Sequence, residues 1–492
     1  MLNRRNLKFL IFCFLSLAFL LAIAFNISPY LRGPAPYPPD WQWTYQFTNT
    51  LGKIWFPLII LAGIFLLAHK TENMTNKILA KNKFLIIGIL IILGFLLQIS
   101  LLFYSRGGIA VIIHRIIDPT INGYFTASLG IHNVLDFLRT YNQNLINLPM
   151  YAKYHPPGAI LFFWVINNIT HFFSFLKIPG INNLPSHKDV ALIWESLKYY
   201  QKESAIISGF IVTFISVLSL IPLYFCSELL YGSKTAIRSM FLFLLLPSIL
   251  LFTPLNDVFM PIFTLSSLYC FLKGIKLESN KYIFVSGIIL FSGVFFDLTF
   301  LPLIAFYFLI YFIYRLKKGY RINYVLLKLP FIFSVGFLII PAVLFTAGLN
   351  FFQTVKIIMG FHEAAQHGRQ YGTWVFYNLY DFLLFLGIFL ALLFCKMIYA
   401  LLKNILQKNF LIVKTNDVIF LAFIVLLFVL DISGSVRGET ARIWIPYAPL
   451  FVLIIANYIT KTFPLSRWQF VILLFLQALQ ILVFQTVLVT VW

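Results

Sequence analysis

The chain has 492 residues, of which 61% are hydrophobic and only 11% are charged, and its formal net charge is +21. A soluble protein of this length cannot hide so much apolar surface, because too much of any folded surface faces solvent. The lysines and arginines lie mostly in short stretches between apolar runs, which is typical of membrane proteins and argues against a nucleic-acid partner. Composition therefore predicts an all-α, polytopic membrane protein with a single domain, 1–492.

Apolar segments recur along the whole chain, and many approach the ~20 residues that a helix needs to cross a bilayer. The first resembles a signal peptide in its basic start, but no small-x-small cleavage pattern follows it, so we interpret it as a retained span. The four cysteines stand singly in apolar runs, which predicts neither a disulfide framework nor a zinc site. The segments fall at 7–26, 54–69, 84–104, 157–177, 204–227, 236–253, 258–274, 282–296, 298–315, 327–347, 377–402, 416–432, 443–459 and 468–491.

Basic clusters between these segments mark the expected cytoplasmic side. Counting spans forward from the first cluster and backward from the cluster at 315–321 gives opposite orientations for the segments between 157 and 300. One segment therefore does not cross the membrane, or it crosses jointly with a neighbour. About thirteen spans with the C-terminus outside satisfy both ends, and the short pair around Asp297 is one suspect for a broken helix. The expected extracytoplasmic loops are 27–53, 105–156, 348–376 and 433–442.

The charged residues of these loops are the informative ones, because charge is costly inside a bilayer. They gather in four stretches, three of which mix acids with bases, as a cavity for an anionic, hydroxylated substrate would. Apolar residues also alternate irregularly with polar ones in 105–156, which is compatible with short amphipathic helices on the membrane surface. The charged or titratable residues are Asp40; Arg106, His114, Arg115, Asp118, Lys153 and His155; His362, Glu363, His367 and Arg369; and Arg437, Glu439 and Arg442.

Each stretch also has a purely structural interpretation. A lone loop aspartate such as Asp40 or Asp118 is usually a turn or cap residue. The stretch "HEAAQH" does not fit the zinc-protease motif, because its histidines stand at i and i+5, about 500° apart around a helix with a 3.6-residue period. The stretch "RGETAR" fits both an interfacial ion-pair network and an arginine fork for a phosphate group. Neither interpretation of "RGETAR" is excluded.

Three short motifs resemble a known superfamily. The loop acid followed by a tyrosine in "DPTINGY" (Asp118 and Tyr124), "HPPG" opening a span, and "RGETARIWIPYAPLF" near the end are similar to the C-type (GT-C) integral membrane glycosyltransferases. Protein O-mannosyltransferases and lipid A aminoarabinose transferases belong to this superfamily. The resemblance implies transfer of a sugar from a polyprenyl-phosphate carrier to an acceptor hydroxyl outside the membrane. It also implies a loop aspartate as general base: Asp118, with Asp40 as the rival.

The stretch "MYAKYHPPG" has a role in this interpretation. Pro156 and Pro157 would fix the start of a helix, whose N-terminus attracts phosphate, while Lys153 and His155 supply donors to the same anion. The structural alternative is an interfacial cap with a snorkelling lysine. No metal ligand is assigned, and the need for a divalent metal is left open. The expected substrate-binding residues are Tyr124, Lys153, His155, Arg106, Arg369, Arg437, Glu439 and Arg442.

Two other functions share these features. A transporter or flippase of lipid-linked sugars would be expected to show paired halves and charges near the middle of spans, whereas Asp257, Asp297 and Asp381 fall at expected span ends. A polymerase of lipid-linked glycans would have similar loops. The favoured prediction is a glycosyltransferase of the bacterial cytoplasmic membrane, with its active site facing outside. Its partners would be a polyprenyl-phosphate-sugar donor, membrane lipids, and a lipid, glycan or protein acceptor.

Overall fold

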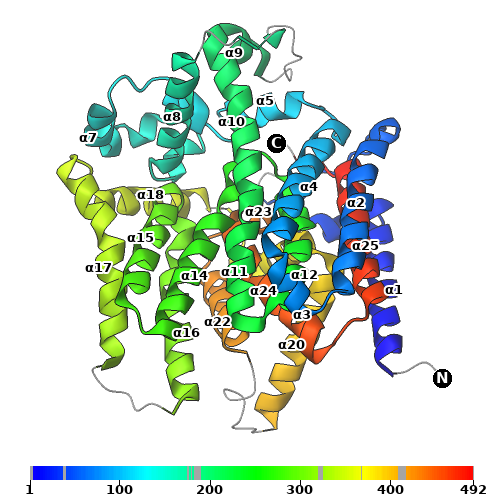
Figure 1. Ribbon diagram of the computed structural model, residues 1–492. Coiled ribbons are helices and arrows are strands. Elements are labelled where there is room, and N and C mark those ends of the chain that lie inside the picture. Colours follow the sequence, from blue (N-terminus) through cyan, green and yellow to red (C-terminus); the bar gives the residue numbers. More distant parts are fainter. Residues whose placement is uncertain are drawn as a thin grey trace.

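The computed structural model is a bundle of helices whose long axes run in roughly the same direction (Figure 1). It describes residues 4–36, 40–173, 177–178, 180–181, 190–319, 325–366, 368–407 and 417–490. About 79% of the chain is helical, and no strand occurs among the residues described. A bilayer offers no partner to a free backbone amide, so apolar segments of this kind satisfy their own hydrogen bonds as helices. The predicted all-α, multi-pass membrane fold is confirmed.

The bundle consists of antiparallel helices with short connections. Several crossings are made of two consecutive pieces, such as α10 with α11. The pieces are α1 (Arg4–Ala24), α2 (Trp55–Glu72), α3 (Asn76–Lys81), α4 (Lys83–Tyr104), α10 (Tyr199–Leu218), α11 (Leu220–Tyr231), α12 (Ser233–Leu244), α13 (Pro247–Leu251), η7 (Asn256–Phe259), α14 (Pro261–Leu277), α15 (Asn280–Phe296), η8 (Leu298–Phe300), α16 (Pro302–Lys317), α17 (Val325–Thr346), α19 (Tyr371–Leu386), α20 (Ile388–Leu406), α22 (Val418–Ile432), η9 (Ile445–Tyr447), α24 (Ala448–Asn457), η10 (Tyr458–Thr462) and α25 (Arg467–Val487).

A second layer of short helices covers one end of the bundle, at the top of Figure 1. We call this end the loop face, because all four predicted extracytoplasmic loops lie there. The N-terminus lies at the opposite end. The elements of this layer are η1 (Pro29–Arg32), η2 (Leu51–Lys53), α5 (Ala110–Ile117), α6 (Tyr124–Ser128), α7 (Val134–Asn144), η3 (Leu145–Asn147), η4 (Ala152–Tyr154), α8 (Gly158–Phe172), α9 (Ala191–Ser196), α18 (Phe351–Ala365) and α23 (Thr440–Ile443).

The number of crossings follows from helix length and from the place of α8. Eleven segments in the described part of the chain are long and apolar enough to span a membrane, and the shorter α15 and α22 lie among them in the bundle (Figure 1). These eleven and two give thirteen crossings, in agreement with the predicted count. An odd number places the two ends of the chain on opposite faces.

The segment that does not cross is α8, which corrects the expected span at 157–177. Helix α8 starts with Gly158 against the backbone of Phe295, at the outer end of α15. It ends with His171 against Tyr200 in the first turn of α10, with ring centroids 4.4 Å apart. Helix α8 therefore runs away from the bundle alongside α10. As a result, "HPPG" opens a helix of the loop-face layer instead of a span. The suspicion of a broken helix around Asp297 was wrong, because α15 and α16 are separate helices.

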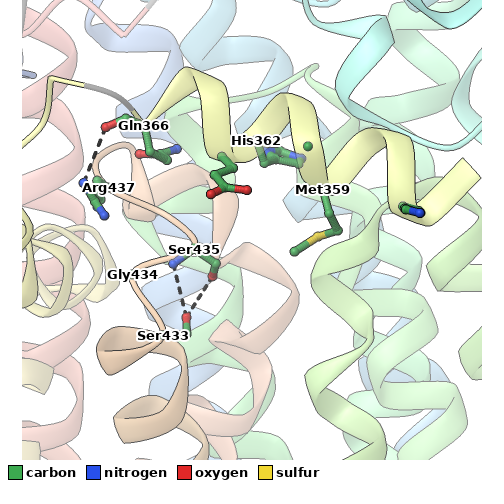
Figure 2. A pocket seen from close by; sticks show the side chains of 10 residues that line it. Met359, His362, Gln366, Ser433, Gly434, Ser435 and Arg437 are labelled. Atoms are coloured by element: carbon green, nitrogen blue, oxygen red, sulfur yellow. Dashed lines mark hydrogen bonds between the residues drawn. The ribbon is translucent and has the colours of Figure 1, made fainter.

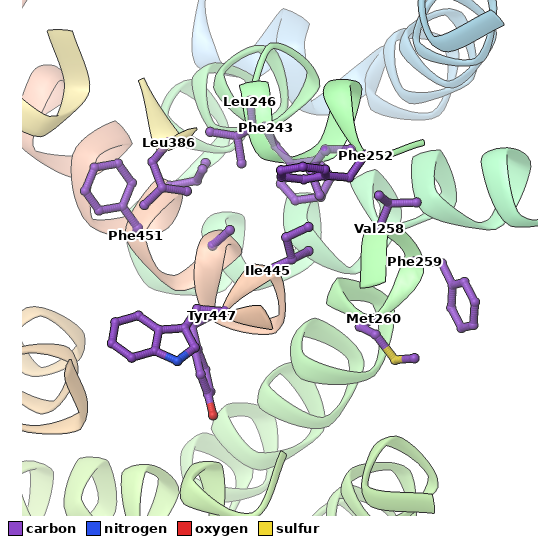
Figure 3. Packing of buried hydrophobic residues seen from close by; sticks show 14 of the residues in the cluster. Phe243, Leu246, Phe252, Val258, Phe259, Met260, Leu386, Ile445, Tyr447 and Phe451 are labelled. Atoms are coloured by element: carbon purple, nitrogen blue, oxygen red, sulfur yellow. The ribbon is translucent and has the colours of Figure 1, made fainter. Parts of the chain in front are cut away.

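A dense apolar core lies beneath the loop face (Figure 3). Phe252 stacks on Phe385 with a centroid distance of 5.5 Å, and Trp43 from the first loop packs on Phe385 at 4.7 Å. On the other side of this core the Tyr447 hydroxyl donates a hydrogen bond to the Thr299 carbonyl. The core therefore joins the first loop, the end of α13 and the start of α24 into one support for the residues above it.

Helices α15 and α17 approach each other through glycines. A Cβ added to Gly287 would lie 2.2 Å from the Phe333 carbonyl oxygen, and one added to Gly336 would lie 2.1 Å from the Phe284 carbonyl oxygen. Small residues let helix backbones pack this closely in membranes. The contact holds α15 in place, and Asp297 follows directly at the end of that helix.

Gly287→Ala is expected to destabilise the protein, because the added methyl group must push α15 and α17 apart. Overpacking of this kind costs roughly 1–3 kcal/mol. The measurement is the midpoint of thermal unfolding in detergent, with Gly88→Ala in α4 as the control, since a Cβ there meets nothing within 4 Å. Equal unfolding midpoints for the two variants would contradict the predicted helix contact.

Candidate functional site

A group of ionisable side chains lies where the inner surface of the loop-face layer meets the outer ends of α14 and α15. Its members come from α6, the η4 turn, η7, the end of α15 and the turn that leads into α23. We call it the polar cluster. It consists of Tyr124, Tyr151, His155, Asp257, Asp297, Glu439 and Arg442.

His155 and Asp297 form the first ion pair of the polar cluster. The His155 Nε2 lies 3.4 Å from Asp297 Oδ2, and its Nδ1 lies 2.9 Å from the Tyr151 carbonyl oxygen. Asp297 is fixed in turn because its Oδ1 accepts a hydrogen bond of 2.8 Å from the Thr299 amide. Burial alone would lower the pKa of His155, but the hydrogen bond and charge of Asp297 raise it above the usual value. The imidazolium form is therefore favoured.

Arg442 forms the second centre of charge. Its Nη2 lies 3.1 Å from Glu439 Oε2, its Nε lies 3.8 Å from Asp257 Oδ2, and its guanidinium lies 5.2 Å from the centre of the Tyr151 ring. Burial would lower the pKa of Arg442, but Glu439 and Asp257 raise it. Two carboxylates and an aromatic ring therefore surround this cation.

The turn before Arg442 needs an unusual backbone. Gly438 has φ +107° and Glu439 has φ +57°, both in the region that L side chains rarely adopt. Asp381 of α19 holds this turn: one oxygen accepts from Trp43 Nε1 at 2.7 Å, and the other accepts from the Ala441 amide at 2.9 Å. The first loop, α19 and 433–442 are thus tied to a single buried carboxylate.

Tyr124 and Asp257 complete the polar cluster. The edge of the Tyr124 ring faces His155, with 5.4 Å between centroids, and burial together with Asp257 and Asp297 raises the pKa of Tyr124, so its hydroxyl stays a neutral donor. The Asp257 side chain remains 23% exposed, and its carboxylate accepts a hydrogen bond from its own backbone amide besides the 3.8 Å contact to Arg442. Of the acids in the polar cluster, Asp257 is the one best able to take a proton from a bound molecule.

The two predicted bases lie in more structural settings. Asp118 follows α5: its Oδ2 lies 3.0 Å from His114 Nε2, while its Oδ1 accepts from both the amide and the hydroxyl of Thr120, each at 2.7 Å. Burial would raise the pKa of Asp118, but these hydrogen bonds hold it below its usual value. Asp40 accepts a hydrogen bond of 3.0 Å from Trp374 Nε1. Nothing in the structure tests the catalytic role predicted for either residue.

Four of the predicted substrate-binding residues meet in the polar cluster, and the other four lie elsewhere. Lys153 lies over the rings of Tyr154 and Phe361, at 5.3 and 5.9 Å, and Arg106 is exposed before α5. Arg437 Nη1 donates 2.7 Å to the Arg369 carbonyl, while Arg369 donates to the Arg437 carbonyl. His367 lies outside the residues described. Those in the polar cluster are Tyr124, His155, Glu439 and Arg442.

Arg437 also lines a cavity of about 600 Å³ between α18 and the 433–437 segment, which we call the α18 cavity (Figure 2). His362 of α18 lines it as well and connects it to the polar cluster, because its ring centre lies 6.4 Å from that of His155. The His362 Nε2 lies 3.1 Å from the Tyr154 carbonyl oxygen. Burial and the neighbouring His155 lower the pKa of His362, which favours its neutral form.

The described residues contain no group of three or more His, Cys, Asp or Glu side chains placed to hold a metal ion. Comparison of the chain with protein-family models, with curated proteins and with solved structures gave no match. The chemistry of the site is therefore argued from its own residues. They offer a carboxylate with free lone pairs, two cations and a neutral phenol within one enclosed region.

The ion pair of His155 and Asp297 is expected to make stability depend on pH. Because the pKa of His155 is raised on folding, its contribution is complete below about 6.5, the usual histidine value, and is lost as the pH rises through the folded value. Asp297, Asp257, His362 and Tyr124 all face this imidazole. Asp297→Asn should therefore lower the unfolding midpoint most near pH 6 and progressively less toward about pH 9.

Asp136→Asn is the matched control, since Asp136 forms an exposed pair with Arg139 at 3.6 Å. Its effect should be small at every pH, because exposed ion pairs contribute little. A destabilisation by Asp297→Asn that is the same from pH 6 to pH 9 would contradict the ion pair.

Proposed function

We propose that this protein is a membrane glycosyltransferase that moves a sugar from a polyprenyl-phosphate-linked donor to an acceptor hydroxyl. The observation that carries the proposal is the polar cluster, in which the partly exposed Asp257 carboxylate lies beside Arg442 and the His155–Asp297 pair. Sugar transfer from a lipid phosphate needs these two parts: a base for the incoming hydroxyl and positive charge for the departing phosphate. The resemblance of "DPTINGY" and "RGETAR" to GT-C enzymes supports the same class, whereas "HPPG" departs from the expected pattern because it does not open a span.

The reaction needs no redox partner. The acceptor oxygen forms a bond to the anomeric carbon while the bond from that carbon to the phosphate oxygen breaks. The carboxylate takes the acceptor proton, and the phosphate leaves with the bonding electron pair and an added negative charge. Cations close to the departing oxygen stabilise that charge more effectively in an enclosed site than in water.

The geometry favours Asp257 as the base over the loop aspartates. Both oxygens of Asp118 are occupied by His114 and Thr120, which suits a residue that shapes the turn before Tyr124. Within the described part of the chain, Asp257 has the long contact to Arg442 and a hydrogen bond from its own amide, which leaves lone pairs for another donor. Asp118 and Asp40 remain predictions from the sequence. Replacing each of the three aspartates by asparagine in turn distinguishes which one acts as the base.

The polar cluster also bears on the transporter alternative. It lies at the loop face, whereas the buried pair of Glu72 and Arg238, at 2.8 Å, joins the inner end of α2 to α12. A carrier that moves a charged headgroup across the membrane is expected to place charges near the middle of its spans. A site confined to one face is better suited to chemistry on that side.

Asp257→Asn is expected to lower sugar transfer by at least ~10²-fold, because an amide cannot accept the proton and general-base help is typically worth ~10²–10⁴. The measurement is transfer of labelled sugar from a polyprenyl phosphate by membranes matched for protein level. Asp118→Asn should lower the unfolding midpoint as well as activity, and Asp40→Asn should do less. Full activity of Asp257→Asn, with loss in a stably folded Asp118→Asn, would assign the base to Asp118.

The loop face is proposed to be extracytoplasmic, in a bacterial cytoplasmic membrane, because the described residues of the basic clusters, such as Arg5, Lys77 and Lys317, lie at the opposite end. Single cysteines at Asn142, in α7, and at Asn76, in α3, should then react differently with a membrane-impermeant maleimide applied to intact cells. We expect labelling at Asn142 and protection at Asn76 until the cells are opened. The reverse pattern would show that the site faces the cytoplasm.

A further inference from the structure

The α18 cavity has the chemistry of a site for a phosphate-bearing lipid. Two cationic side chains line it, Lys356 of α18 and Arg437, together with the hydroxyls of Ser433 and Ser435, whereas Glu363 is the one acid among the lining residues. Phosphate oxygens accept charge-assisted hydrogen bonds from the two cations. The Ser433 hydroxyl already donates to the Leu430 carbonyl at 2.7 Å and lies 2.8 Å from the Ser435 hydroxyl, so the two cations are the main donors for an anion. Lys356 was not singled out from the sequence.

Arg437 has donors left for such an anion. A guanidinium carries five N–H groups. Among the described residues, only Nη1 is engaged, by the carbonyls of Arg369 and Gln366, and the buried Nε has no hydrogen-bond partner. The bonds made by Nη1 and the Tyr371 ring, 5.7 Å away, hold the guanidinium in place. Arg437 is therefore oriented before any ligand binds.

An apolar surface lies directly beside these cations. Lys356 and Gly360 also line a second, more open cavity of about 940 Å³, which continues along α18 past Phe352 and Ile357. The Phe352 side chain is 70% exposed. Helix α18 lies across the bundle at its loop face, between the outer ends of α17 and α19 (Figure 1). A molecule with an anionic head and an apolar tail matches the two adjoining cavities, whereas a free phosphate ion would use only the first.

The α18 cavity also lies next to the polar cluster. His362 lines the cavity, and its ring centre is 6.4 Å from that of His155, which is paired with Asp297. We propose that the α18 cavity binds the phosphate of a polyprenyl-phosphate lipid through Lys356 and Arg437, with the lipid chain lying along the apolar side of α18. That the lipid is a polyprenyl phosphate and the sugar donor rests on the proposed function, whereas the match of the cavities to an anionic head and an apolar tail rests on their lining residues.

Gly360 offers a way to close the site without disturbing the fold. A Cβ added there meets nothing within 4 Å, so a large side chain can grow into the cavities that Gly360 lines. Gly360→Trp should therefore block binding, while Gly360→Ala should leave it unchanged. Lys356→Gln should weaken it about tenfold or more through loss of a charge-assisted contact. The matched control is Lys276→Gln, because Lys276 lies in the last turn of α14, at the end of the bundle opposite the loop face.

The experiment is saturation binding of radiolabelled farnesyl phosphate to the full-length protein in neutral phosphatidylcholine nanodiscs. Unlabelled farnesyl phosphate should compete, whereas farnesol and inorganic phosphate should compete at least tenfold more weakly. Two results would overturn the proposal: unchanged binding in both Gly360→Trp and Lys356→Gln, or equal competition by inorganic phosphate, which would indicate a site for the free anion. The unfolding midpoint of each variant shows whether lost binding reflects lost folding.

Lipid binding by the α18 cavity and sugar transfer by the protein can each be present without the other, so the two proposals are tested separately. Saturable binding that depends on Lys356 and Gly360, without any sugar transfer, would support the lipid site and contradict the glycosyltransferase. Sugar transfer that is unaffected by Lys356→Gln and Gly360→Trp would support the enzyme and contradict this location for its lipid.

Discussion

Arg442 carries a positive charge into a buried position beside a membrane bundle, and much of the loop face is arranged so that this charge is neutralised. A buried cation without a partner is strongly destabilising. Glu439 and Asp257 provide the compensation, at 3.1 and 3.8 Å, and they come from different parts of the chain. Glu439 stands three residues before Arg442, at a turn with positive φ angles, and Asp381 holds that turn from α19. One buried charge therefore links the 433–442 loop, η7 and α19.

This arrangement explains why a reactive carboxylate can persist at the site. Asp257 is retained as a counter-charge to Arg442, yet the 3.8 Å separation leaves its oxygens able to accept a proton from another group. The His155–Asp297 pair provides a second cation whose protonation is also stabilised by a carboxylate. His362, which favours its neutral form, lies between this pair and the α18 cavity. The site thus combines an acid-rich region with a more basic one, which under the proposed function would receive the sugar with its acceptor and the phosphate, respectively.

Much of the architecture could be predicted from the sequence, because apolar length and basic flanks report directly on membrane spans. They gave the fold class, the approximate number of crossings and the grouping of four loops on one face. They could not show that 157–177 stays outside the bundle, since an apolar helix packed against α10 and α6 has the same composition as a span.

The site was only partly predictable for a different reason. Tyr124, His155, Glu439 and Arg442 stood in recognisable loop motifs, but the residues that complete the polar cluster depend on distant contacts. Asp257 and Asp297 appeared in the sequence merely as acids at span ends. Arg437 and Arg442 looked equivalent in "RGETAR". In the structure, the turn at Gly438 lies between them, so that Arg437 lines the α18 cavity and Arg442 belongs to the polar cluster.

The most direct test of the central claim is a cryo-electron microscopy structure of the protein with a bound polyprenyl-phosphate sugar. The account predicts the phosphate in the α18 cavity within hydrogen-bond distance of Lys356 or Arg437, and the sugar beside His155 and Asp257 in the polar cluster. Density for the sugar in the middle of the bundle, or at the opposite face with the polar cluster empty, would contradict the assignment of a glycosyltransfer site to the loop face.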